Sequence, residues 1–176
     1  ALTILKEKKN RILLEQHSYS LPAIQYRSLL HGVLEQSRDL KTETRDDLKI
    51  VTSKSPSETE IDDLLFANKL VKHSKSNAII LVKNGQLIGS GAGQTSRIDA
   101  LKQAIDKAKA FGFSVEGAAM ASDAFFPFND CVTIAAEAGV KSVIQPGGSI
   151  KDADSVEACN KMGISMVLTG FRHFKH

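Results

Sequence analysis

The sequence predicts an α/β fold with a mainly parallel sheet, helices on both faces and one antiparallel strand contributed by a hairpin. In the last two thirds of the chain, short β-rich runs alternate with longer segments of helical periodicity, and Gly112, Gly139 and Gly163 end those segments. Asn84 and Gly85 separate the first two β-rich runs. Asn-Gly favours a tight hairpin because both residues tolerate positive φ.

The first 55 residues carry weaker signals and are predicted to be the tail of a preceding subdomain with a linker. Residues 1–9 fit a short amphipathic helix and residues 11–14 a short apolar strand, but neither has a neighbour to complete a core. Residues 26–36 fit a strand or a hairpin. Residues 56–176 are predicted to form one subdomain.

A helix is predicted from Pro56 or Ser57 to about His73. Glu58 and Glu60 supply the acidic residues that are favoured in a first helical turn. One face of this segment carries, at helical spacing, Ile61, Leu64, Leu65, Asn68 and Val71.

A hairpin follows this helix, with strands at residues 78–82 and 86–88. A two-residue turn at its tip makes the numbers of paired residues sum to 169. This register places Asn77 near Ala92.

The next helix is predicted to begin near Arg97, where Ser96 and Asp99 have the spacing of a capping box, and to end before Gly112. Its apolar face consists of Ile98, Leu101, Ile105, Ala108 and Phe111. Strands and helices then alternate, with a strand at 115–121, a helix at 130–138, a strand at 141–144, a helix at 152–162 and a strand at 164–168.

The composition excludes several function classes. The 176 residues suffice for one sizeable core, and 23 basic against 20 acidic residues give a net charge of +3. This balance disfavours a nucleic-acid binder and fits a small anionic ligand. Cys131 and Cys159 form no CxxC pair, so neither a disulfide scaffold nor a zinc site is indicated. With no apolar run of membrane-spanning length and no signal-peptide pattern, we expect a cytoplasmic protein with no membrane partner.

Four polar loops follow four strands of the predicted sheet, at residues 89–97, 122–130, 145–149 and 169–176. Parallel strands end at one sheet edge, where open α/β sheets bind their ligands. The antiparallel strand brings Asn77 to the same edge. One pocket is therefore predicted from Asn77, Arg97, Phe125, Asp130, Ser149, Arg172 and His176.

Each of these loops also has a structural interpretation. Residues 89–93 can present backbone amides to an anion, although a plain glycine turn between strand and helix is commoner. Residues 146–149 have the same two interpretations. Arg97 opposes the helix dipole, which indicates either a compensating anion, from a ligand or a carboxylate, or an exposed side chain.

The aromatic run at residues 125–128 favours a core plug, with stacking on a planar heterocycle as the alternative. Asp130 is predicted to cap the following helix and also to contact a ligand. Residues 172–176 form a basic tail, for which disorder is the ordinary expectation. Phe174 and the apolar strand just before the tail favour docking.

Two segments are more specific than the rest, SDAFFPFND at residues 122–130 and GFRHFKH at residues 170–176. Together with residues 76–79, 83–86, 88–98 and 143–150, they closely resemble the AICAR transformylase domain of the bifunctional AICAR transformylase/IMP cyclohydrolase family. The segments occur in the family's order, and the resemblance covers nearly the whole chain.

This resemblance implies a fold similar to that of cytidine deaminases, a three-layer sandwich that occurs twice in the full transformylase domain. The chain matches the second unit, the C-terminal half, without its inserted subdomain. The HxE and PCxxC zinc signature of the deaminases is absent, so no metal is expected.

The family transfers a formyl group from the cosubstrate 10-formyltetrahydrofolate to the exocyclic amine of AICAR in de novo purine biosynthesis, and the resemblance implies this reaction. Matching positions imply catalytic roles for Asn77 and His176. They imply AICAR contacts for Asn77, Arg97, Phe125 and Arg172. They imply folate contacts for Ile98, Phe125, Pro127, Asp130, Ser149 and Ile150.

The resemblance also implies partners. The family's general base is a histidine of a Lys-His pair in the first deaminase-like unit, which lies ahead of this chain, and Lys72-His73 and Lys175-His176 match other family segments. We therefore expect the first half of the domain as a partner, a homodimer as the assembly, and little or no activity of the chain alone. Asn129 departs from the basic residue usual in the family, which affects any charge-dependent folate contact there.

Two other functions are compatible with the residues. A non-catalytic nucleotide or folate binding module would use the same loops without turnover. A purely structural assembly domain is hard to reconcile with so many polar loops at one sheet edge.

Overall fold

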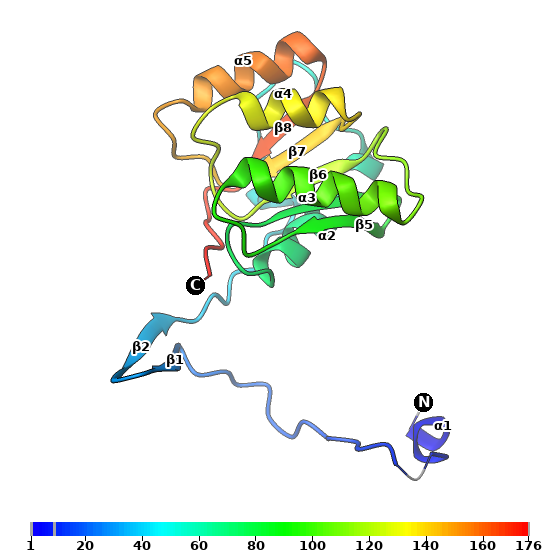
Figure 1. The fold of residues 1–176 in the computed structure, drawn as a ribbon, viewed down its shortest axis with the longest axis vertical. Coiled ribbons are helices and arrows are strands. Elements are labelled where there is room, and N and C mark those ends of the chain that lie inside the picture. The colour runs from blue at the N-terminus through cyan, green and yellow to red at the C-terminus, as the bar shows by residue number, and fades with distance from the viewer. Residues whose placement is uncertain (1, 9, 176) are drawn as a thin grey trace. The chain divides into compact units, whose positions relative to one another are not determined.

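The computed structural model describes residues 2–8 and 10–175, and the chain divides into two compact units, Ala1–Leu40 and Lys41–His176 (Figure 1). The sequence predicts a boundary after residue 55. In the structure, residues 41–55 belong to the second unit, where they contribute a short strand to its sheet.

The first unit contains a short helix and a hairpin. α1 spans Leu2–Lys6, inside the helix predicted for residues 1–9, and none of its residues is buried. β1 (Ile24–Leu29) pairs antiparallel with β2 (Gly32–Ser37), so the hairpin alternative for residues 26–36 is confirmed.

The second unit is built on a six-stranded sheet with the strand order β3-β8-β7-β6-β4-β5. Its strands are β3 (Lys49–Ile50), β4 (Ile79–Lys83), β5 (Gln86–Gly91), β6 (Ala119–Ser122), β7 (Ser142–Gln145) and β8 (Ser165–Leu168). β6, β7 and β8 are parallel, and β4 pairs antiparallel with both β5 and β6. The predicted mainly parallel sheet with one antiparallel hairpin strand is confirmed. β3, which pairs antiparallel with β8, was not predicted.

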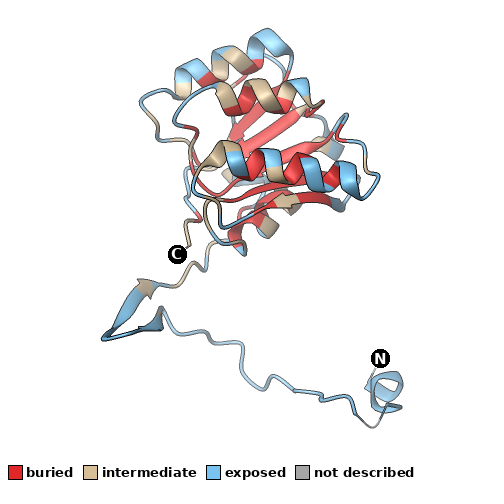
Figure 2. Ribbon diagram, in the orientation of Figure 1, coloured by how far each residue is buried: buried red, intermediate tan, exposed pale blue. Residues whose placement is uncertain are grey.

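Helices cover both faces of this sheet, which makes the second unit a three-layer α/β sandwich. α3 (Arg97–Ala110), α4 (Asp130–Glu137) and α5 (Asp152–Met162) lie side by side on one face, and α2 (Glu58–Lys72) covers the other (Figure 1). Figure 2 shows buried strands between helices whose outer surfaces are exposed. Among the described helices, none is long and apolar enough to cross a membrane.

The alternation of side chains along β4 supplies both layers of the core. Ile79 and Leu81 are buried in the cluster that also holds residues of α3, α4 and α5. Ile80 and Val82 are buried in a second cluster, with residues of α2. Successive side chains of a strand point to opposite faces, so a continuous apolar run is what a sheet covered on both faces requires.

The predicted start of α2 is confirmed. The hydroxyl of Ser57 accepts the Glu60 amide at 3.2 Å, and the Glu60 carboxylate accepts the Ser57 amide at 2.7 Å, which completes a capping box. Asp63, in the second turn, accepts the amides of Asn84 and Gly85 at 2.8 and 2.6 Å. The helix is thereby tied to the hairpin tip.

Two strand predictions are corrected by the structure. Residues 11–14 form no strand: the Arg11 amide closes a local turn with the carbonyl three residues earlier, at 3.1 Å, and Ile12 and Leu14 are exposed. The strand predicted at 115–121 begins only at Ala119, since Gly117 turns the chain with φ +80°.

A β-bulge in the β4–β5 pair shifts the predicted hairpin register by one residue. Pairs near the tip sum to 169 as predicted, whereas Ile79 faces Gly91 beyond the bulge. Asn77 exchanges two backbone hydrogen bonds with Gln94, at 3.2 and 3.3 Å. The predicted place beside Ala92 is therefore wrong by two residues, one of which the bulge explains, although Asn77 still lies at the edge where β5 ends.

The apolar face of α3 was predicted correctly except at its end. Leu101, Ile105 and Ala108 are buried, but Phe111 is 76% exposed. The helix has already ended at Phe111, and Gly112 turns the chain with φ +76°, so the ring no longer lies on the buried face.

α3 lies unusually close to β5 because two positions of that strand are glycine. A Cβ added to Gly91 would lie 1.8 Å from the carbonyl oxygen of Ala100, and one added to Gly89 would lie 2.2 Å from that of Ala104. The neighbouring atoms are helix backbone, which cannot rotate away. Close helix–strand packing therefore explains these glycines, a role that the sequence analysis did not consider.

We predict that Gly91→Ala lowers the free energy of unfolding by about 1–3 kcal/mol, the usual cost of overpacking a core. Urea denaturation of the full chain measures it. Gly32→Ala is the matched control, because a Cβ there would meet nothing within 4 Å and should leave stability unchanged. Equal stability of the two variants would contradict the packing role.

We also predict that stability falls at alkaline pH because of the two buried thiols. Burial raises the pKa of Cys131 to about 12, with a smaller contribution from Asp130, and burial raises the pKa of Cys159 to about 12. In the unfolded chain the thiols ionise near roughly 8.5. Between that pH and about 12 the folded state keeps protons that the unfolded state loses, so folding is progressively disfavoured.

Denaturation midpoints at a series of pH values test this dependence. A chain with Cys131→Ala and Cys159→Ala should lose part of the alkaline slope. A slope that both cysteine substitutions leave unchanged would contradict the assignment.

Candidate functional site

The ends of β5, β6, β7 and β8 lie at one edge of the sheet, because these four strands run in the same direction. The segments that follow them carry the predicted site residues. The antiparallel strand β4 begins at this edge, which places Asn77 there as well.

Arg97, the first residue of α3, forms a buried ion pair with Asp123, which follows β6. Its Nη2 donates to Asp123 Oδ1 at 2.6 Å, and its Nε donates to Ser122 Oγ at 2.8 Å. The two charged side chains are 9% and 0% exposed. A carboxylate therefore compensates the cation at the helix N-terminus, as one sequence alternative predicted.

The Asn77 side chain is held at the same edge. Its Nδ2 donates to the carbonyl oxygens of Gln94 and Thr95, at 3.0 and 3.2 Å. The side chain is half-buried. Because the amide nitrogen is fixed, the Oδ1 oxygen at the other end of the planar group also has a fixed direction.

The C-terminal tail is docked, which confirms that alternative over disorder. The Lys175 amide donates to Ser76 Oγ at 2.8 Å, and the Lys175 carbonyl accepts the Ser76 amide at 3.1 Å. The amide of His173 donates to the backbone carbonyl of Asp123 at 3.1 Å. The tail thus contacts both the residue next to Asn77 and the partner of Arg97.

Arg172 is exposed, and its guanidinium lies 4.1 Å from the centre of the Phe174 ring. A cation over an aromatic face is attracted by the ring's negative quadrupole. His176, the other predicted residue of the tail, lies outside the described residues.

A buried polar cluster lies between the tail and α2 and was not predicted. Glu43, Asn68 and His173 are 4%, 3% and 2% exposed. Glu43 Oε2 accepts from Asn68 Nδ2 at 2.8 Å and lies 3.0 Å from His173 Nε2. No local sequence pattern indicates the Glu43–His173 contact, because the two residues are 130 positions apart. Glu43 also lies in the segment that was predicted to be a tail and linker.

The aromatic loop contains one buried side chain and three that are half-buried or exposed. Phe126 is fully buried and is the core plug, and its amide donates to Gln145 Oε1 at 3.3 Å. Phe125 is half-buried, and Pro127 and Phe128 are exposed. Lys151 Nζ lies 4.4 Å from the centre of the Phe128 ring.

Asp130 is not the N-cap of α4, which corrects the prediction. The helix begins at Asp130 itself, and the preceding Asn129 already has helical dihedrals and makes no side-chain cap hydrogen bond, so Asp130 lies inside the first turn. Asp130 Oδ1 accepts the adjacent amide of Cys131 at 2.8 Å. Among the described residues, no hydrogen bond joins Asp130 to Arg97 or Asn77.

The glycine loop after β7 is occupied by the chain's own carboxylate. Asp152 Oδ2 accepts the amides of Gly148 and Ser149 at 2.7 and 3.2 Å. The two amides that could have bound an anion are therefore engaged. Ile150, next in the chain, is fully exposed, and Ile98 is partly buried against the core below α3.

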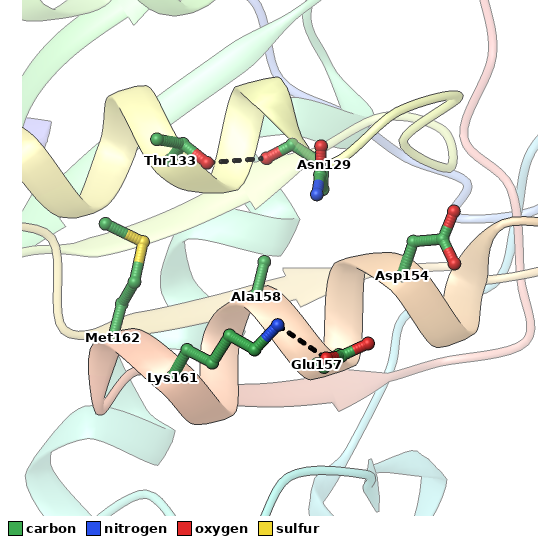
Figure 3. A pocket seen from close by; sticks show the side chains of 7 residues that line it. All are labelled: Asn129, Thr133, Asp154, Glu157, Ala158, Lys161 and Met162. Atoms are coloured by element: carbon green, nitrogen blue, oxygen red, sulfur yellow. Dashed lines mark hydrogen bonds and ion pairs between the residues drawn. The ribbon is translucent and has the colours of Figure 1, made fainter.

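A cavity of about 300 Å³ lies between α4 and α5 (Figure 3). Thr133 of α4 and Asn129, just before that helix, line it on one side, and the Thr133 hydroxyl donates to the Asn129 carbonyl at 3.2 Å. Across it, Glu157 and Lys161 of α5 form an ion pair at 2.5 Å. The described site residues predicted from the sequence do not line this cavity.

Side chains that ligate metals do not gather in the described part of the chain. Within residues 2–8 and 10–175, no group of three or more His, Cys, Asp or Glu side chains could hold a metal ion.

We predict that Asp123→Asn lowers the free energy of unfolding by about 3–5 kcal/mol, because it leaves the Arg97 guanidinium buried without a counter-charge. Urea denaturation measures the loss. Glu157→Gln is the control, since it breaks an exposed ion pair and should leave the unfolding midpoint unchanged. Similar midpoints for the two variants would show that the Arg97–Asp123 pair contributes nothing specific.

Two solved structures are similar to part of this chain. The apo dCMP deaminase from the cyanophage S-TIM5 is 21% identical with a TM-score of 0.44, and the match covers 64% of this chain and 98% of the deaminase. Acinetobacter baumannii RibD is 22% identical with a TM-score of 0.42, and the match covers 64% of this chain and 36% of that chain.

Curated relatives match the whole sequence and share one name, bifunctional purine biosynthesis protein PurH. The protein from Bacteroides thetaiotaomicron is 61% identical over 176 residues, covering 100% of this chain and 35% of the relative. That from Aquifex aeolicus is 48% identical over 180 residues, covering 100% and 34%. The chain thus spans about a third of the length of these relatives. A family model described as AICARFT/IMPCHase bienzyme matches residues 1–107. The chain therefore belongs to the AICARFT/IMPCHase bienzyme family, whose PurH members act in purine biosynthesis.

Proposed function

We propose that this chain is the C-terminal half of an AICAR formyltransferase domain and supplies one wall of the site that formylates AICAR. The observation that carries the proposal is that Asn77, Arg97 and the C-terminal tail with Arg172 meet at one sheet edge. Asp123 binds both Arg97 and the tail, and Ser76, next to Asn77, binds the tail as well. Membership of the family makes a nucleotide and a formyl folate the ligands to test.

The chemistry explains what such a wall has to do. The exocyclic amine of AICAR is a weak nucleophile, because its lone pair is conjugated into the imidazole ring. Its reaction with a formyl group needs an acceptor for the amine proton, a donor for the developing oxyanion and two substrates in fixed positions. This chain contributes positioning and hydrogen bonding.

Asn77 is assigned to the reacting centre. Its Oδ1 can accept from the amine of AICAR, and its direction is fixed because Gln94 and Thr95 hold the amide nitrogen. Because the side chain is already oriented before the substrate binds, less conformational entropy is lost on binding. His176 is assigned a catalytic role from its position in the family motif.

Arg97 and Arg172 are assigned to oxygen atoms of AICAR. A guanidinium has five N–H donors, and Ser122 and Asp123 use two of those of Arg97. The other donors suit carbonyl or phosphate oxygens, since the planar fork binds them in pairs. Arg172 is exposed on a docked tail, which suits a charged group that arrives from solvent.

The folate is assigned to the loops next to this edge. Phe125 is half-buried and offers a ring face to either planar ligand. Ile98, Pro127, Asp130, Ser149 and Ile150 complete the proposed 10-formyltetrahydrofolate contacts. Asn129 stands where the family usually has a basic residue, so it provides no positive charge for a folate contact.

The general base is assigned to another segment or subunit, the first half of the transformylase domain, with a homodimer as the working assembly in the cytoplasm. The isolated chain should then be nearly inactive with saturating AICAR and formyl folate. Turnover should appear on mixing with the first half. Full turnover by the chain alone would overturn this assignment, and binding without turnover in the mixture would favour a non-catalytic binding module.

We predict that AICAR binds the isolated chain and that Arg172→Ala removes most of this binding. A charge-assisted bond to phosphate or carbonyl oxygen contributes about 1.5–3 kcal/mol, which corresponds to a loss of roughly tenfold to a hundredfold in affinity. Calorimetric titration measures it. Arg11→Ala, an exposed arginine of the first unit, is the control and should bind as the unmodified chain does. Equal affinity in all three proteins would remove Arg172 from the site.

A further inference from the structure

We infer that Glu43, Asn68 and His173 form a buried pin that positions the C-terminal tail, so that Glu43 and His173 are positioning residues for the site. The inference rests on the proposed function for the ligand involved. Nothing in the family motif assigns a role to Glu43, which lies in the segment before β3.

The burial of His173 is specific to that side chain. His173 is 2% exposed, whereas Phe171 and Arg172 are exposed and Phe174 and Lys175 are half-buried. A polar ring buried at a chain end costs free energy unless it is hydrogen-bonded, and the Glu43 carboxylate lies 3.0 Å from Nε2. A single side chain of the tail is therefore inserted into the second unit and held there.

The Glu43 carboxylate that contacts His173 is itself held in place. Asn68 of α2 donates to the same Glu43 oxygen at 2.8 Å. One turn further along α2, Lys72 donates to the Lys41 carbonyl and lies 3.3 Å from Thr42 Oγ1, which ties the segment before Glu43 to the helix. The pin thus connects the tail to α2, an element packed against the sheet.

The pin lies next to both halves of the proposed nucleotide wall. The His173 amide donates to the carbonyl of Asp123, whose carboxylate holds Arg97. Two residues later, Lys175 exchanges hydrogen bonds with Ser76, beside Asn77. Arg172 directly precedes the pinned residue, so releasing His173 leaves the tail beyond Arg172 attached through the Lys175–Ser76 hydrogen bonds.

Contacts within the tail cannot replace this attachment. The Arg172–Phe174 contact and the Phe171–His173 ring contact, at 5.4 Å between ring centres, join tail residues to each other. They shape the tail without locating it on the rest of the unit. Among the hydrogen bonds of the described residues after Phe171, those of His173 and Lys175 join the tail to the rest of the unit.

The test combines Glu43→Gln with His173→Phe in the full chain. The glutamine side chain keeps an oxygen for Asn68 and leaves no buried charge, while a phenyl ring fills the space of the imidazole without a hydrogen bond. Glu43→Gln alone is the conservative variant, because its amide can still bond the imidazole. Glu157→Gln is the matched control, since it breaks an exposed ion pair on α5 and changes no tryptic site.

Two readouts are compared in the same four proteins, the unmodified chain included. The first is the rate at which trypsin removes the residues after Arg172, followed by mass spectrometry of the C-terminus and divided by the cleavage rate of the matching unfolded peptide, because His173→Phe changes the residue after the cleaved bond. Cleavage tracks the population in which the tail is open. The second is AICAR affinity by calorimetry.

We expect the double variant to be cleaved after Arg172 about tenfold faster or more, and to lose AICAR affinity by a similar factor. Glu43→Gln should lie in between, and Glu157→Gln should match the unmodified chain. An unchanged cleavage rate in a folded double variant would overturn the pin. Faster cleavage with unchanged AICAR affinity would overturn the positioning role.

Two further measurements keep the outcomes separate. If the double variant does not fold, hydrogen exchange of the unmodified chain decides. A docked tail requires protected backbone amides at His173 and Lys175. Rapid exchange of these amides would overturn the pin. If the unmodified chain binds no AICAR, the proposed function fails, while the cleavage comparison still decides whether the tail is pinned.

Discussion

A buried ion pair between Arg97 and Asp123 joins three parts of the second unit at the sheet edge. Arg97 begins α3, Asp123 follows β6, and the Asp123 backbone carbonyl accepts the His173 amide of the tail. Burying two opposite charges costs several kcal/mol per ion unless their mutual attraction and further hydrogen bonds offset it. Ser122 supplies one such bond to Arg97. The helix start, the strand end and the tail are therefore held in one arrangement, on which the geometry of the edge depends.

The reversed direction of β4 brings a further segment to this edge. Because β4 runs against both of its neighbours, it is the start of β4 that lies where β5 and β6 end. Ser76 and Asn77 therefore stand beside the tail and the turn after β5. The bulge in the β4–β5 pair shifts the register by one residue, and a further one-residue offset beyond Ile79 places Asn77 opposite Gln94, so that Gln94 and Thr95 hold its side chain.

Much of the proposed site could be predicted from the sequence, and the features that could not be predicted have separate physical causes. Strand order and direction were enough to bring Asn77, Arg97 and the tail to one edge. The two glycine-rich loops were harder, because turns, anion sites and close packing all use glycine. In the structure Asp152 occupies the amides of Gly148 and Ser149, and Gly91 gives room to α3. The proposed ligand contacts at the edge therefore rest on side chains more than on backbone amides.

The sequence by itself determined the elements whose signals act over a few residues. Ser57 and Ser96 cap helices, Asn84 and Gly85 close a hairpin, and α5 has the limits that its sequence predicts. Only the tertiary structure decided that β3 extends the sheet, that a bulge shifts the hairpin, and that Glu43 meets His173 across 130 residues. These features depend on which polar groups are left without partners once the core has formed. That balance of burial and hydrogen bonding is a property of the packed molecule, so no local pattern of residues encodes it.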